Sequence, residues 1–382
     1  MYKVVHIITD LSVGGAQMML NKLISRTNRK RFEVAVISLM DEGVIGKKIR
    51  AQGVPLYCVN MWRGWPDPVS ACKLIRRVNR IGPDLIQGWM YHGNLAAQMT
   101  HVFLKKPCPV LWNIRHSVFD LADEKWKTAL VIRLCARMSK KPAQILYNSR
   151  VSSIQHERLG YCSRKTLVIP NGFDTNEFFP SAQARAEIRK ELGLSSSTPL
   201  IGLIARYHPM KDHANFLRAA AQLSALRPEV HFLLAGNKVD EENSDLMDWV
   251  RRLKLESKVH LLGYRKDVSR VTAALDIASI SSFHGEGFPN VVGEAMAGGI
   301  PCVVTDVGDS AWVVGDVGKV VPPKDPGAMA AAWMEFLTME KKDRDRLGEA
   351  GRKRIENNFG LSTIVSQYEN VYEKVLACSD EN

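Results

Sequence analysis

At 382 residues the chain is longer than one hydrophobic core usually supports, so we expect two domains. Its content of 46% hydrophobic and 24% charged residues is typical of a globular protein and excludes a disordered or collagen-like chain. Residues 1–180 hold 27 Lys and Arg against 12 Asp and Glu, whereas residues 181–382 hold 25 against 28. A basic half beside a nearly neutral half indicates an anionic partner for the first half: a phospholipid surface, a lipid-linked phosphate or a nucleic acid.

Targeting signals are not evident. No apolar run is long enough to cross a bilayer, and the start MYKVVHIITDL has no cleavage pattern, so we expect a buried first strand rather than a signal peptide. The seven cysteines are widely spaced and never form a C-x-x-C pair. We therefore expect neither a disulfide framework nor a zinc site. We expect a cytoplasmic location, because thiols stay reduced there.

Short β-branched runs alternate with amphipathic stretches through both halves. The runs predict strands over 3–9, 33–38, 56–58, 85–88, 110–114 and 143–147, and then over 200–205, 230–235, 259–262, 277–281, 301–305 and 319–321. Helices are predicted over 16–26, 68–81, 127–139, 213–226, 246–253 and 361–376. This alternation is typical of parallel sheets with helices on both faces, formed twice.

The stretch VIPNGFD at 168–174 separates the two series of strands. Pro170-Asn171-Gly172 forces a tight turn, and a Ser-rich loop before 200 leads into a new first strand. We place a domain boundary here; an ordinary loop within one large domain is the alternative.

Two glycines, Gly14 and Gly15, follow the first predicted strand and begin a helix. Glycines at such a position let the backbone approach a phosphate, which the free N–H groups and the helix N-terminus attract. The segment matches neither a G-x-G-x-x-G fingerprint nor a Walker loop. By itself it fits a structural turn as well as a phosphate site.

Arg206 and Lys211 follow the first strand of the second half. They lie at the carboxyl edge of the predicted sheet, where ligands bind in open α/β folds. Arg can bind a diphosphate through two hydrogen bonds, and Lys adds a positive charge. Solvated surface charges are the alternative interpretation.

Two carboxylates, Glu286 and Glu294, are separated by seven residues in the segment EGFPNVVGEAMAGGIP. Glu286 lies between glycines on a loop, and Glu294 lies in the helix that follows. The N–H groups near Asn290 then form an anion site at a helix N-terminus. A carboxylate suits a hydroxyl-rich ligand because it accepts two hydrogen bonds from neighbouring hydroxyls. A helix with an ordinary acidic residue and a glycine cap is the alternative, but it leaves this convergence unexplained.

These motifs together resemble the retaining family 4 glycosyltransferases (glycosyl transferases group 1). The glutamate pair matches the family signature, and Arg206 with Lys211 matches its diphosphate-binding pair. Three further segments match in order: GGAQ at 14–17, VIPNGFD at 168–174 and GYRKD at 263–267.

The resemblance implies a GT-B fold, with two Rossmann-like domains facing across a cleft. Residues 1–170 would form the N-terminal acceptor-binding domain and residues 171–360 the domain that binds the nucleotide sugar. Residues 361–382 would form a helix that packs back on the N-terminal domain. The implied activity is transfer of a hexosyl or N-acetylhexosaminyl group, with retention, from a UDP- or GDP-sugar to a saccharide or lipid-linked acceptor. Cell-envelope, capsular, exopolysaccharide or lipopolysaccharide synthesis would fit.

The resemblance also implies roles for single residues. Glu294 would bind the donor ribose, and Glu286 would contact the transferred sugar, as nucleophile or as contact only. Arg206 and Lys211 would stabilise the leaving diphosphate, and His92 would face the sugar from the N-terminal domain. The full implied donor set is Gly14, Gly15, Arg206, Lys211, Tyr264, Arg265, Gly287, Phe288, Pro289, Asn290, Val291 and Glu294.

Two segments depart from the family pattern. Gly308-Asp309-Ser310-Ala311-Trp312 stands where the family often has two glycines followed by Glu, which puts a contact near the donor in doubt. Gln17 stands where Glu is more usual. The Asp343-x-Asp345 sequence lies in a Lys/Arg-rich helical stretch and is interpreted as a solvated helix face, so no metal or other cofactor is expected.

The acceptor side is predicted in the basic half, where Asn113, Arg115 and His116 end a strand. Residues 125–141 (KWKTALVIRLCARMSKK) form a basic amphipathic stretch suited to an anionic bilayer, and Trp62 and Trp65 could add contacts. We therefore expect a peripheral location on the inner face of the plasma membrane, although packing of this helix on the sheet is the alternative. Two other functions stay open: a GT-B-fold sugar-nucleotide epimerase, and a basic nucleic-acid-binding protein, which lacks a recognisable module and leaves the glutamate pair unexplained.

Overall fold

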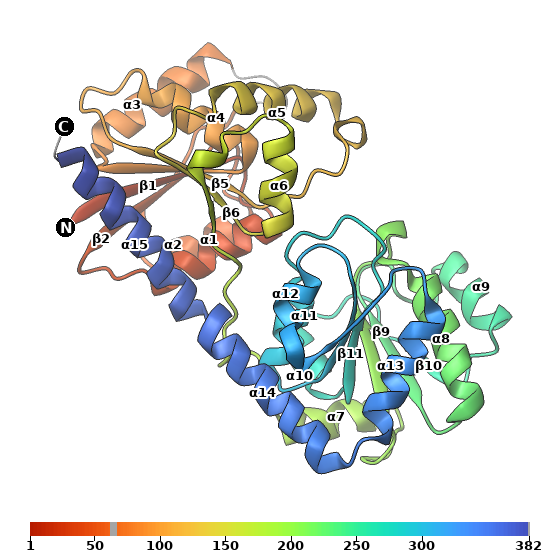
Figure 1. Cartoon of the computed structure of the whole chain (residues 1–382). Helices are drawn as coiled ribbons and strands as arrows, with labels where there is room; N and C mark the ends of the chain where they lie inside the picture. Colours follow the sequence, from red (N-terminus) through yellow and green to blue (C-terminus); the bar gives the residue numbers. More distant parts are fainter. Residues whose placement is uncertain (62–66, 381–382) are drawn as a thin grey trace. The chain divides into compact units, whose positions relative to one another are not determined.

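The computed structural model describes residues 1–61 and 67–380. The chain forms two compact units, shown as ribbons in Figure 1. Unit 1 contains residues 1–172 and the C-terminal segment that begins at Leu361, and unit 2 contains Phe173–Gly360. Trp62 and Trp65 lie outside the described residues.

Unit 1 is built on a parallel sheet of seven strands in the order β3-β2-β1-β4-β5-β6-β7. The strands are β1 (Tyr2–Ile8), β2 (Phe32–Ser38), β3 (Leu56–Cys58), β4 (Leu85–Trp89), β5 (Val110–Ile114), β6 (Gln144–Tyr147) and β7 (Thr166–Val168). Its helices are α1 (Gly15–Arg26), α2 (Gly43–Ala51), α3 (Pro68–Ile81), α4 (Met90–His101), α5 (Trp126–Met138), α6 (Arg150–Arg158) and α15 (Leu361–Asp380), with short 3₁₀ turns η1 (Leu121–Asp123) and η2 (Ser163–Lys165).

Unit 2 is built on a parallel sheet of six strands in the order β10-β9-β8-β11-β12-β13. The strands are β8 (Leu200–Ile204), β9 (His231–Ala235), β10 (Val259–Leu261), β11 (Ile277–Ile280), β12 (Cys302–Thr305) and β13 (Lys319–Val321). Its helices are α7 (Ala182–Glu191), α8 (His213–Leu226), α9 (Ser244–Arg252), α10 (Val268–Ala273), α11 (Asn290–Ala297), α12 (Ser310–Val314), α13 (Pro326–Thr338) and α14 (Lys341–Phe359), with 3₁₀ turns η3 (Pro209–Lys211) and η4 (Gly315–Val317).

The predicted strands are confirmed, each to within a residue at either end. The sequence missed β7, a short strand whose residues are all half-buried and which therefore lacks a clear apolar pattern. It also missed helices α2, α4, α6, α10, α12 and α13. In α4 the reason is that the helix buries polar residues such as Asn94, Gln98 and Thr100 beside its apolar ones. Buried polar side chains break the periodicity from which a helix is predicted.

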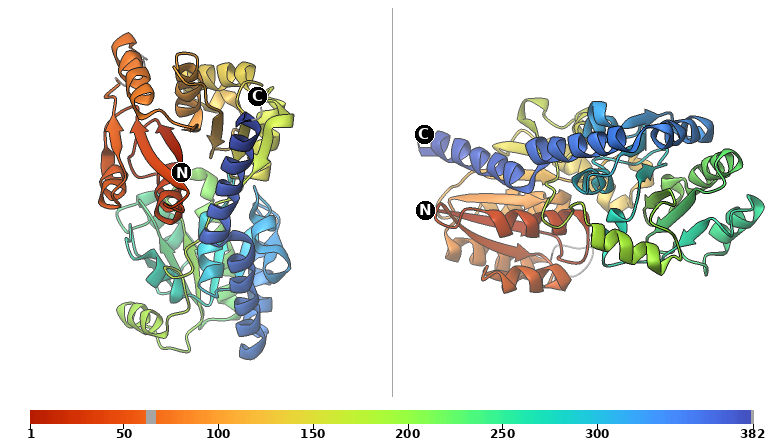
Figure 2. Two further views of the ribbon diagram at one scale, coloured as in Figure 1. Left: turned by 90° about the vertical axis from the view of Figure 1, so that its left-hand side faces the viewer. Right: turned by 90° about the horizontal axis from the view of Figure 1, so that it is seen from below.

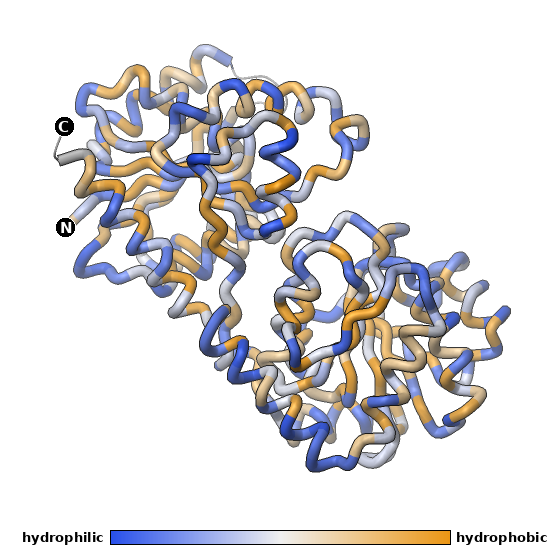
Figure 3. Tube along the Cα trace, viewed as in Figure 1, coloured by the Kyte–Doolittle hydropathy of each residue, from blue (hydrophilic) through white to orange (hydrophobic). Residues whose placement is uncertain are grey.

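Each sheet is covered by apolar side chains on both faces. Figure 3 shows apolar residues concentrated on the central strands of each unit and polar ones along α14. One core layer of unit 1 includes residues of α15, among them Ile364, Val365 and Tyr372, packed with α1, β1 and β2. In Figure 2, α15 lies along unit 1 with the C-terminus at its end. The last helix of the chain is thus part of the hydrophobic core of unit 1.

Candidate functional site

The strand order of unit 2 reverses between β8 and β11, because β8 pairs with β9 on one side and with β11 on the other. At such a point the loops after the two strands diverge and leave room for a ligand at the carboxyl edge of the sheet. The loop after β8 carries Arg206 and Lys211, and the loop after β11 carries Glu286. The fold thus brings together three residues selected from distant motifs.

The loop after β8 is shaped by local capping. His208 begins η3, and its ring nitrogen Nδ1 accepts a hydrogen bond from the N–H of Met210 at 3.4 Å. Asp212 adopts a left-handed backbone conformation (φ 47°) and caps α8 by accepting from the N–H of Asn215 at 3.1 Å. Lys211 lies between these caps, whereas Arg206 is exposed just beyond β8. Desolvation, and then the positive charges of Arg206 and Lys211, lower the pKa of His208. The loop is therefore a region of positive potential.

Glu286 and Lys211 form an ion pair in this site, with the ammonium on Oε1 of the carboxylate. The side chain of Lys211 is 18% exposed and that of Glu286 is 10% exposed, so the pair is largely screened from water. The same Oε1 accepts a hydrogen bond from the hydroxyl of Ser282 at 2.6 Å. The carboxylate is thus held by one charged and one neutral donor.

Other hydrogen bonds fix the main chain around this pair. The Ser281 hydroxyl donates to the Lys211 carbonyl at 2.7 Å, and the N–H of Phe283 donates to the Met210 carbonyl at 3.0 Å. The Thr305 hydroxyl, at the end of β12, donates to the Ser282 carbonyl at 2.6 Å. These bonds join the loops after β8, β11 and β12 into one assembly. The sequence did not point to Ser281, Ser282 or Thr305, since a lone hydroxyl carries no recognisable pattern.

Gly308, in the segment that departs from the family pattern, packs directly against the Glu286 loop. It has a left-handed backbone (φ 61°), and a Cβ at this position would lie 2.5 Å from the Glu286 carbonyl oxygen. The N–H of Asp309 donates to the Gly287 carbonyl at 2.9 Å. The segment 308–309 therefore supports the main chain of Glu286 and Gly287, although it lacks the expected glutamate.

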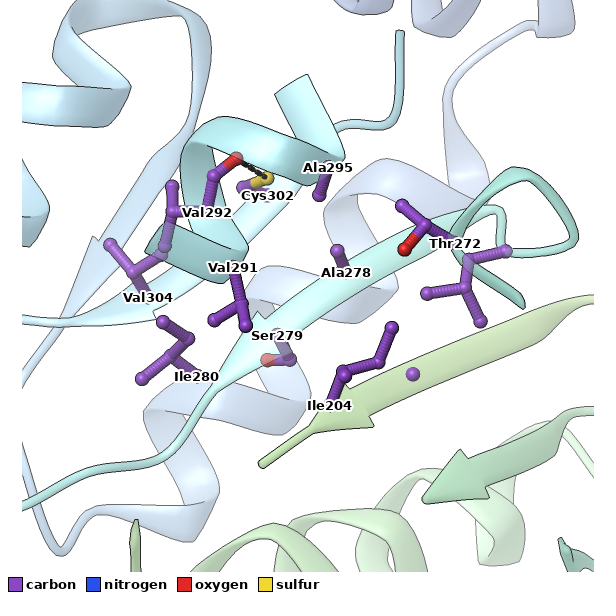
Figure 4. A pocket seen from close by; sticks show the side chains of 12 residues that line it. Ile204, Thr272, Ala278, Ser279, Ile280, Val291, Val292, Ala295, Cys302 and Val304 are labelled. Atoms are coloured by element: carbon purple, nitrogen blue, oxygen red, sulfur yellow. Dashed lines mark hydrogen bonds between the residues drawn. The ribbon is translucent and has the colours of Figure 1, made fainter. Parts of the chain in front are cut away.

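Helix α11 starts at Asn290 and carries Glu294, which is half-buried, in its second turn. Its apolar side packs over β8 and β11: Val291 and Ala295 point toward Ile204 and Ala278 (Figure 4). The cavity between them measures only about 10 Å³, too small for a ligand, so it belongs to the packing under the helix. Gly293 lets Phe173 pack on α11, since a Cβ there would lie 2.1 Å from the Phe173 ring.

The segment from Gly287 to Pro289 contributes main chain rather than side chains to any ligand. Phe288 is buried in an aromatic group, with its ring centre 5.9 Å from that of Phe173 and 5.8 Å from that of Trp312. Pro289, also buried, precedes the first turn of α11. The Phe288 side chain thus anchors the loop, and Asn290 and Val291 begin the helix, so a donor contact from Phe288 stays a prediction that concerns its main chain.

The loop after β10 carries Tyr264 and Arg265, which were assigned to the nucleotide base. The Tyr264 side chain is exposed, whereas Arg265 binds Glu191 at 2.6 Å and Asp267 at 2.8 Å. Hydrogen bonds to these carboxylates raise the pKa of Arg265 above its ordinary value. Arg265 therefore holds this loop to α7, and Tyr264 is the side chain of the pair that is open to a ligand.

In unit 1 the strand order reverses between β1 and β4. Gly14 precedes α1 and Gly15 is its first residue; a Cβ on Gly15 would meet nothing within 4 Å. Gln17 donates to Asp10 Oδ1 at 3.3 Å, which ties the loop to the first turn of α1. The glycine loop therefore leaves open space beside the start of a helix.

His92 follows β4 and lies in the first turn of α4. The turn is tight: Met90 has a left-handed backbone (φ 61°), and Gly93 approaches the Ile7 carbonyl, where a Cβ would lie 2.6 Å away. The His92 side chain reaches the surface, but desolvation by its neighbours lowers its pKa. The imidazole is therefore neutral at neutral pH and lies at the same edge of the sheet as Gly14 and Gly15.

Asn113 and Arg115 are engaged by the C-terminal helix. The Asn113 amide, which is fully buried, donates to the Tyr368 hydroxyl at 2.9 Å, and Arg115 donates to the same hydroxyl at 2.8 Å. Arg115 also binds the side chain of Asn171, in the segment that ends unit 1. The two side chains therefore attach α15 and residue 171 to the end of β5, and a contact with the acceptor stays a prediction for both.

His116 retains an open side chain, 39% exposed, and lies in a network of polar groups. Its Nδ1 is 3.3 Å from the Tyr91 hydroxyl, which is 2.8 Å from Nε2 of the buried His156. Its Nε2 is 3.5 Å from Glu124. Desolvation lowers the pKa of His156 to about 4, so this inner histidine is neutral. No pattern in the sequence links Tyr91 to His156, because the two residues meet only through the fold.

The Asp343 and Asp345 side chains form ion pairs within α14, with Arg346 at 3.2 Å and Lys341 at 2.5 Å. All four side chains are more than half exposed. A solvated helix face is the interpretation that these contacts support.

Comparison with known families accounts for both units. The family model described as Glycosyltransferase Family 4 matches residues 13–177, and that described as Glycosyl transferases group 1 matches residues 184–354. The chain belongs to the family 4 glycosyltransferases. This glycosyltransferase carries the two family segments in the same order as its two structural units.

Relatives and solved structures agree with this assignment. The glycosyltransferase is 26% identical, over 85% of its length and 84% of the relative, to the UDP-Gal:alpha-D-GlcNAc-diphosphoundecaprenol alpha-1,3-galactosyltransferase of Escherichia coli. It is 29% identical to the lipopolysaccharide core biosynthesis mannosyltransferase LpsB of Rhizobium meliloti (strain 1021), over 56% of its own length and 63% of LpsB. The crystal structure of HepE from Anabaena in complex with UDP superposes with a TM-score of 0.84 at 21% identity, covering 97% of this chain and 100% of HepE. The fold is therefore that of GT-B glycosyltransferases.

Among the residues that the structure describes, none of the helices is both long enough and apolar enough to span a bilayer.

Proposed function

We propose that the protein transfers a sugar, with retention of the anomeric configuration, from a UDP-sugar to a lipid-linked saccharide acceptor. The observation that supports this most directly is the meeting of Lys211 and Glu286 at the strand reversal of unit 2. Arg206 lies on the same loop as Lys211, and Glu294 lies on the helix that follows Glu286. Cations, a helix N-terminus and two carboxylates match a diphosphate flanked by a ribose and a hexose.

Each group has a defined part in the proposed reaction. Arg206 and Lys211 stabilise the negative charge that develops on the departing diphosphate, where preorganised charges lower a barrier most. Glu294 accepts hydrogen bonds from the ribose hydroxyls, and Glu286 binds the transferred sugar. The acceptor hydroxyl attacks on the face from which the diphosphate leaves, and a phosphate oxygen of the leaving group takes the hydroxyl proton. Unit 1 would contribute Gly14, Gly15 and His92. Because Arg206 and Lys211 provide the positive charge, the proposed reaction requires no metal.

The choice of UDP is supported by two similar proteins. HepE from Anabaena has been solved in complex with UDP and with UDP-glucose. The name of the Escherichia coli relative states UDP-Gal as its donor. A hexosyl or N-acetylhexosaminyl group on UDP is therefore the donor that we propose.

The choice of a lipid-linked acceptor is supported by the basic charge of the first half and by the same relative, whose named acceptor is a diphosphoundecaprenol. Helix α5 adds a surface of suitable chemistry. One side of the helix is buried and consists of Ala129, Ile132, Cys135 and Ala136. The other side exposes three apolar side chains spaced by four residues: Trp126, Leu130 and Leu134. Two exposed arginines, Arg133 and Arg137, lie beside them. We propose that this exposed face rests on an anionic bilayer, which places the protein on the inner face of the plasma membrane, in cell-envelope polysaccharide synthesis.

A panel of nucleotides and nucleotide sugars, followed by thermal stabilisation and calorimetry, tests the donor site. Glu294→Ala should weaken binding of UDP about 10- to 100-fold, because hydrogen bonds to a charged group are worth roughly 1.5–3 kcal/mol. Glu349→Ala, in an exposed ion pair on α14, is the matched control and should bind as the wild type does. Failure of every nucleotide to bind the wild type, or equal binding by Glu294→Ala, would refute the donor assignment.

Retention is tested on the best donor of that panel. Slow hydrolysis of the donor, followed by proton NMR from the first minutes, should release the sugar in the anomeric configuration of the nucleotide sugar. First appearance of the opposite anomer would exclude retention, and conversion of the nucleotide sugar into an isomer without release of UDP would indicate an epimerase. Addition of EDTA should leave the rate unchanged.

Vesicle sedimentation tests the membrane surface independently of catalysis. The protein should sediment with vesicles of phosphatidylglycerol and not with phosphatidylcholine alone, and high salt should weaken binding. Leu130→Ser should reduce binding several-fold, whereas Leu226→Ser should not, although Leu226 of unit 2 is even more exposed than Leu130. Equal binding by both variants would contradict the assignment of α5.

A further inference from the structure

We propose that Ser282 is a positioning residue, which keeps the Glu286 carboxylate in place when Lys211 turns from Glu286 to the diphosphate of the donor. The inference rests on the proposed donor site. It adds a residue that the family motif and the sequence did not assign, and it follows from how three side chains share one carboxylate oxygen.

Lys211 has two partners in the proposed reaction, and the structure shows its contact with one of them, Glu286. Its ammonium pairs with Oε1 of Glu286, and the same ammonium is the group assigned to the leaving diphosphate. A diphosphate carries more negative charge than one carboxylate and attracts the ammonium more strongly. Donor binding therefore weakens the contact between Lys211 and Glu286.

Glu286 needs another donor at that moment, because its side chain is only 10% exposed. A carboxylate with so little access to water is costly to leave without a hydrogen bond. It would also be free to rotate away from the sugar. Lys211 and Ser282 both donate to Oε1, so the hydroxyl of Ser282 is the contact that remains when Lys211 moves.

Ser282 is well suited to this part because its own position is fixed. The residue is fully buried, and its hydroxyl lies 2.6 Å from Glu286 Oε1. Its carbonyl accepts from the hydroxyl of Thr305, also fully buried, at 2.6 Å. The hydrogen bond from Thr305 ties Ser282 to the end of β12, a strand paired on both sides in the sheet of unit 2. The hydroxyl therefore holds Glu286 from a rigid support.

The preceding residue confines the movement to the Lys211 side chain. The Ser281 hydroxyl donates to the Lys211 carbonyl at 2.7 Å and so fixes the main chain of that residue. The flexible four-carbon stem of lysine lets the ammonium change partners without a change in the backbone. Ser281 thus holds the main chain of Lys211, while Ser282 holds the carboxylate of Glu286.

The expected signature separates sugar positioning from nucleotide binding. UDP has no transferred sugar, so its contacts with Glu294 and Arg206 do not involve Ser282. The affinity of Ser282→Ala for UDP should fall several-fold at most, because no contact to UDP is lost and, with no sugar in place, water can hydrogen-bond Glu286 when Lys211 moves to the diphosphate. Turnover of the best nucleotide sugar should fall about 10- to 100-fold in kcat/KM, mostly through kcat, because the lost bond is one to a charged group.

Two further variants make the test specific. Ser279→Ala, on β11, is the matched control: Ser279 is also buried and bonds the Val303 carbonyl at 3.0 Å and the Trp333 indole N–H at 3.1 Å, but neither partner lies in the site. It should retain kcat. Thr305→Val, which removes the support of Ser282, should lower kcat in the same direction but less, whereas Thr305→Ser should retain it. Thermal melting of each variant confirms that it is folded.

The outcomes are distinguishable. Equal kcat in Ser282→Ala and Ser279→Ala, or a parallel loss of UDP affinity and turnover in Ser282→Ala, would overturn the positioning role. If Ser282→Ala does not fold, a Thr305→Val variant with wild-type kcat overturns it. A wild-type protein that neither binds UDP nor turns over any nucleotide sugar would instead refute the proposed function.

Discussion

The two units have the same kind of sheet but differ at the edge where each strand order reverses. In unit 2 this edge holds a charged pair, Lys211 and Glu286, supported by the hydroxyls of Ser281 and Ser282 on the loop after β11. In unit 1 the corresponding edge holds two glycines and His92, whose pKa is lowered by desolvation. The charge needed to bind a diphosphate is therefore built into unit 2, although unit 1 is the basic half of the chain.

The difference teaches that net charge does not locate the charged site. Excess basic residues of unit 1 lie on its surface, for example on α5, where Arg133 and Arg137 are exposed. The one arginine at the end of β5, Arg115, is bound to Tyr368 and Asn171 and serves the structure. A small number of partly buried charges, held by hydrogen bonds, matter more to chemistry than many solvated ones.

Removal of the cation from the unit 2 edge should have the largest effect. Lys211→Met should lower kcat about 10²- to 10³-fold, because a preorganised group opposite the developing charge is lost. It should also destabilise the protein by about 1–3 kcal/mol, since Glu286 stays buried without its partner. Enzyme kinetics measure the change in kcat, and urea unfolding measures the change in stability. Lys190→Met, at an exposed residue of α7, is the control.

The double variant Lys211→Met/Glu286→Gln separates stability from catalysis. It should regain most of the lost stability, because no unpaired buried charge remains, but none of the lost turnover. Recovery of turnover in the double variant would show that Lys211 acts only through Glu286.

Loss of the shared hydroxyl in unit 1 should have a smaller effect, confined to stability. Tyr368→Phe leaves the buried Asn113 amide and the Arg115 guanidinium without a common acceptor. The free energy of unfolding should fall by about 1–3 kcal/mol, with UDP affinity unchanged. Urea unfolding measures this, and Tyr264→Phe, on an exposed side chain, should change it little. A loss of UDP binding in Tyr368→Phe would contradict the separation of the two roles.

Acid should lower the stability of the two units by similar amounts, so it should produce the smallest difference between them. Burial lowers the pKa of His156 in unit 1 and of His213 in unit 2 to about 4, from an unfolded value of 6.5. Each neutral histidine therefore contributes stability that is complete above pH 6.5 and is lost as the pH falls toward 4. At pH 5.5 the loss should be about 1.4 kcal/mol for each group, since one pKa unit corresponds to about that free energy.

Urea unfolding at pH 7.5 and pH 5.5 checks this for the wild type, His156→Gln and His213→Gln. Each variant should lose less stability on acidification than the wild type does. If only one of the two variants shows this smaller loss of stability, the two units differ in their response to acid.

Much of the fold and the core of the site were predictable because their signals are local. β-branched runs mark the strands that lie in the middle of each sheet, and Glu286 and Glu294 are close enough in sequence to be recognised as one motif. The short edge strand β7 and helix α4 were missed, since half-buried residues and buried polar side chains weaken the pattern. The sequence pattern thus predicts a helix or strand reliably where one face of the element is apolar, and fails where no such face exists.

The sequence by itself determined two parallel α/β units and singled out a basic pair, Arg206 and Lys211, and a glutamate pair, because each rests on neighbouring residues with a characteristic pattern. Only the tertiary structure decided what those residues touch. It joined Asn113 and Arg115 to Tyr368, packed Phe288 against Phe173 and brought Ser282 onto Glu286. The physical reason is that the role of a buried polar group depends on the partner with which it forms a hydrogen bond. That partner usually comes from a distant part of the chain, as Tyr368 does for Asn113.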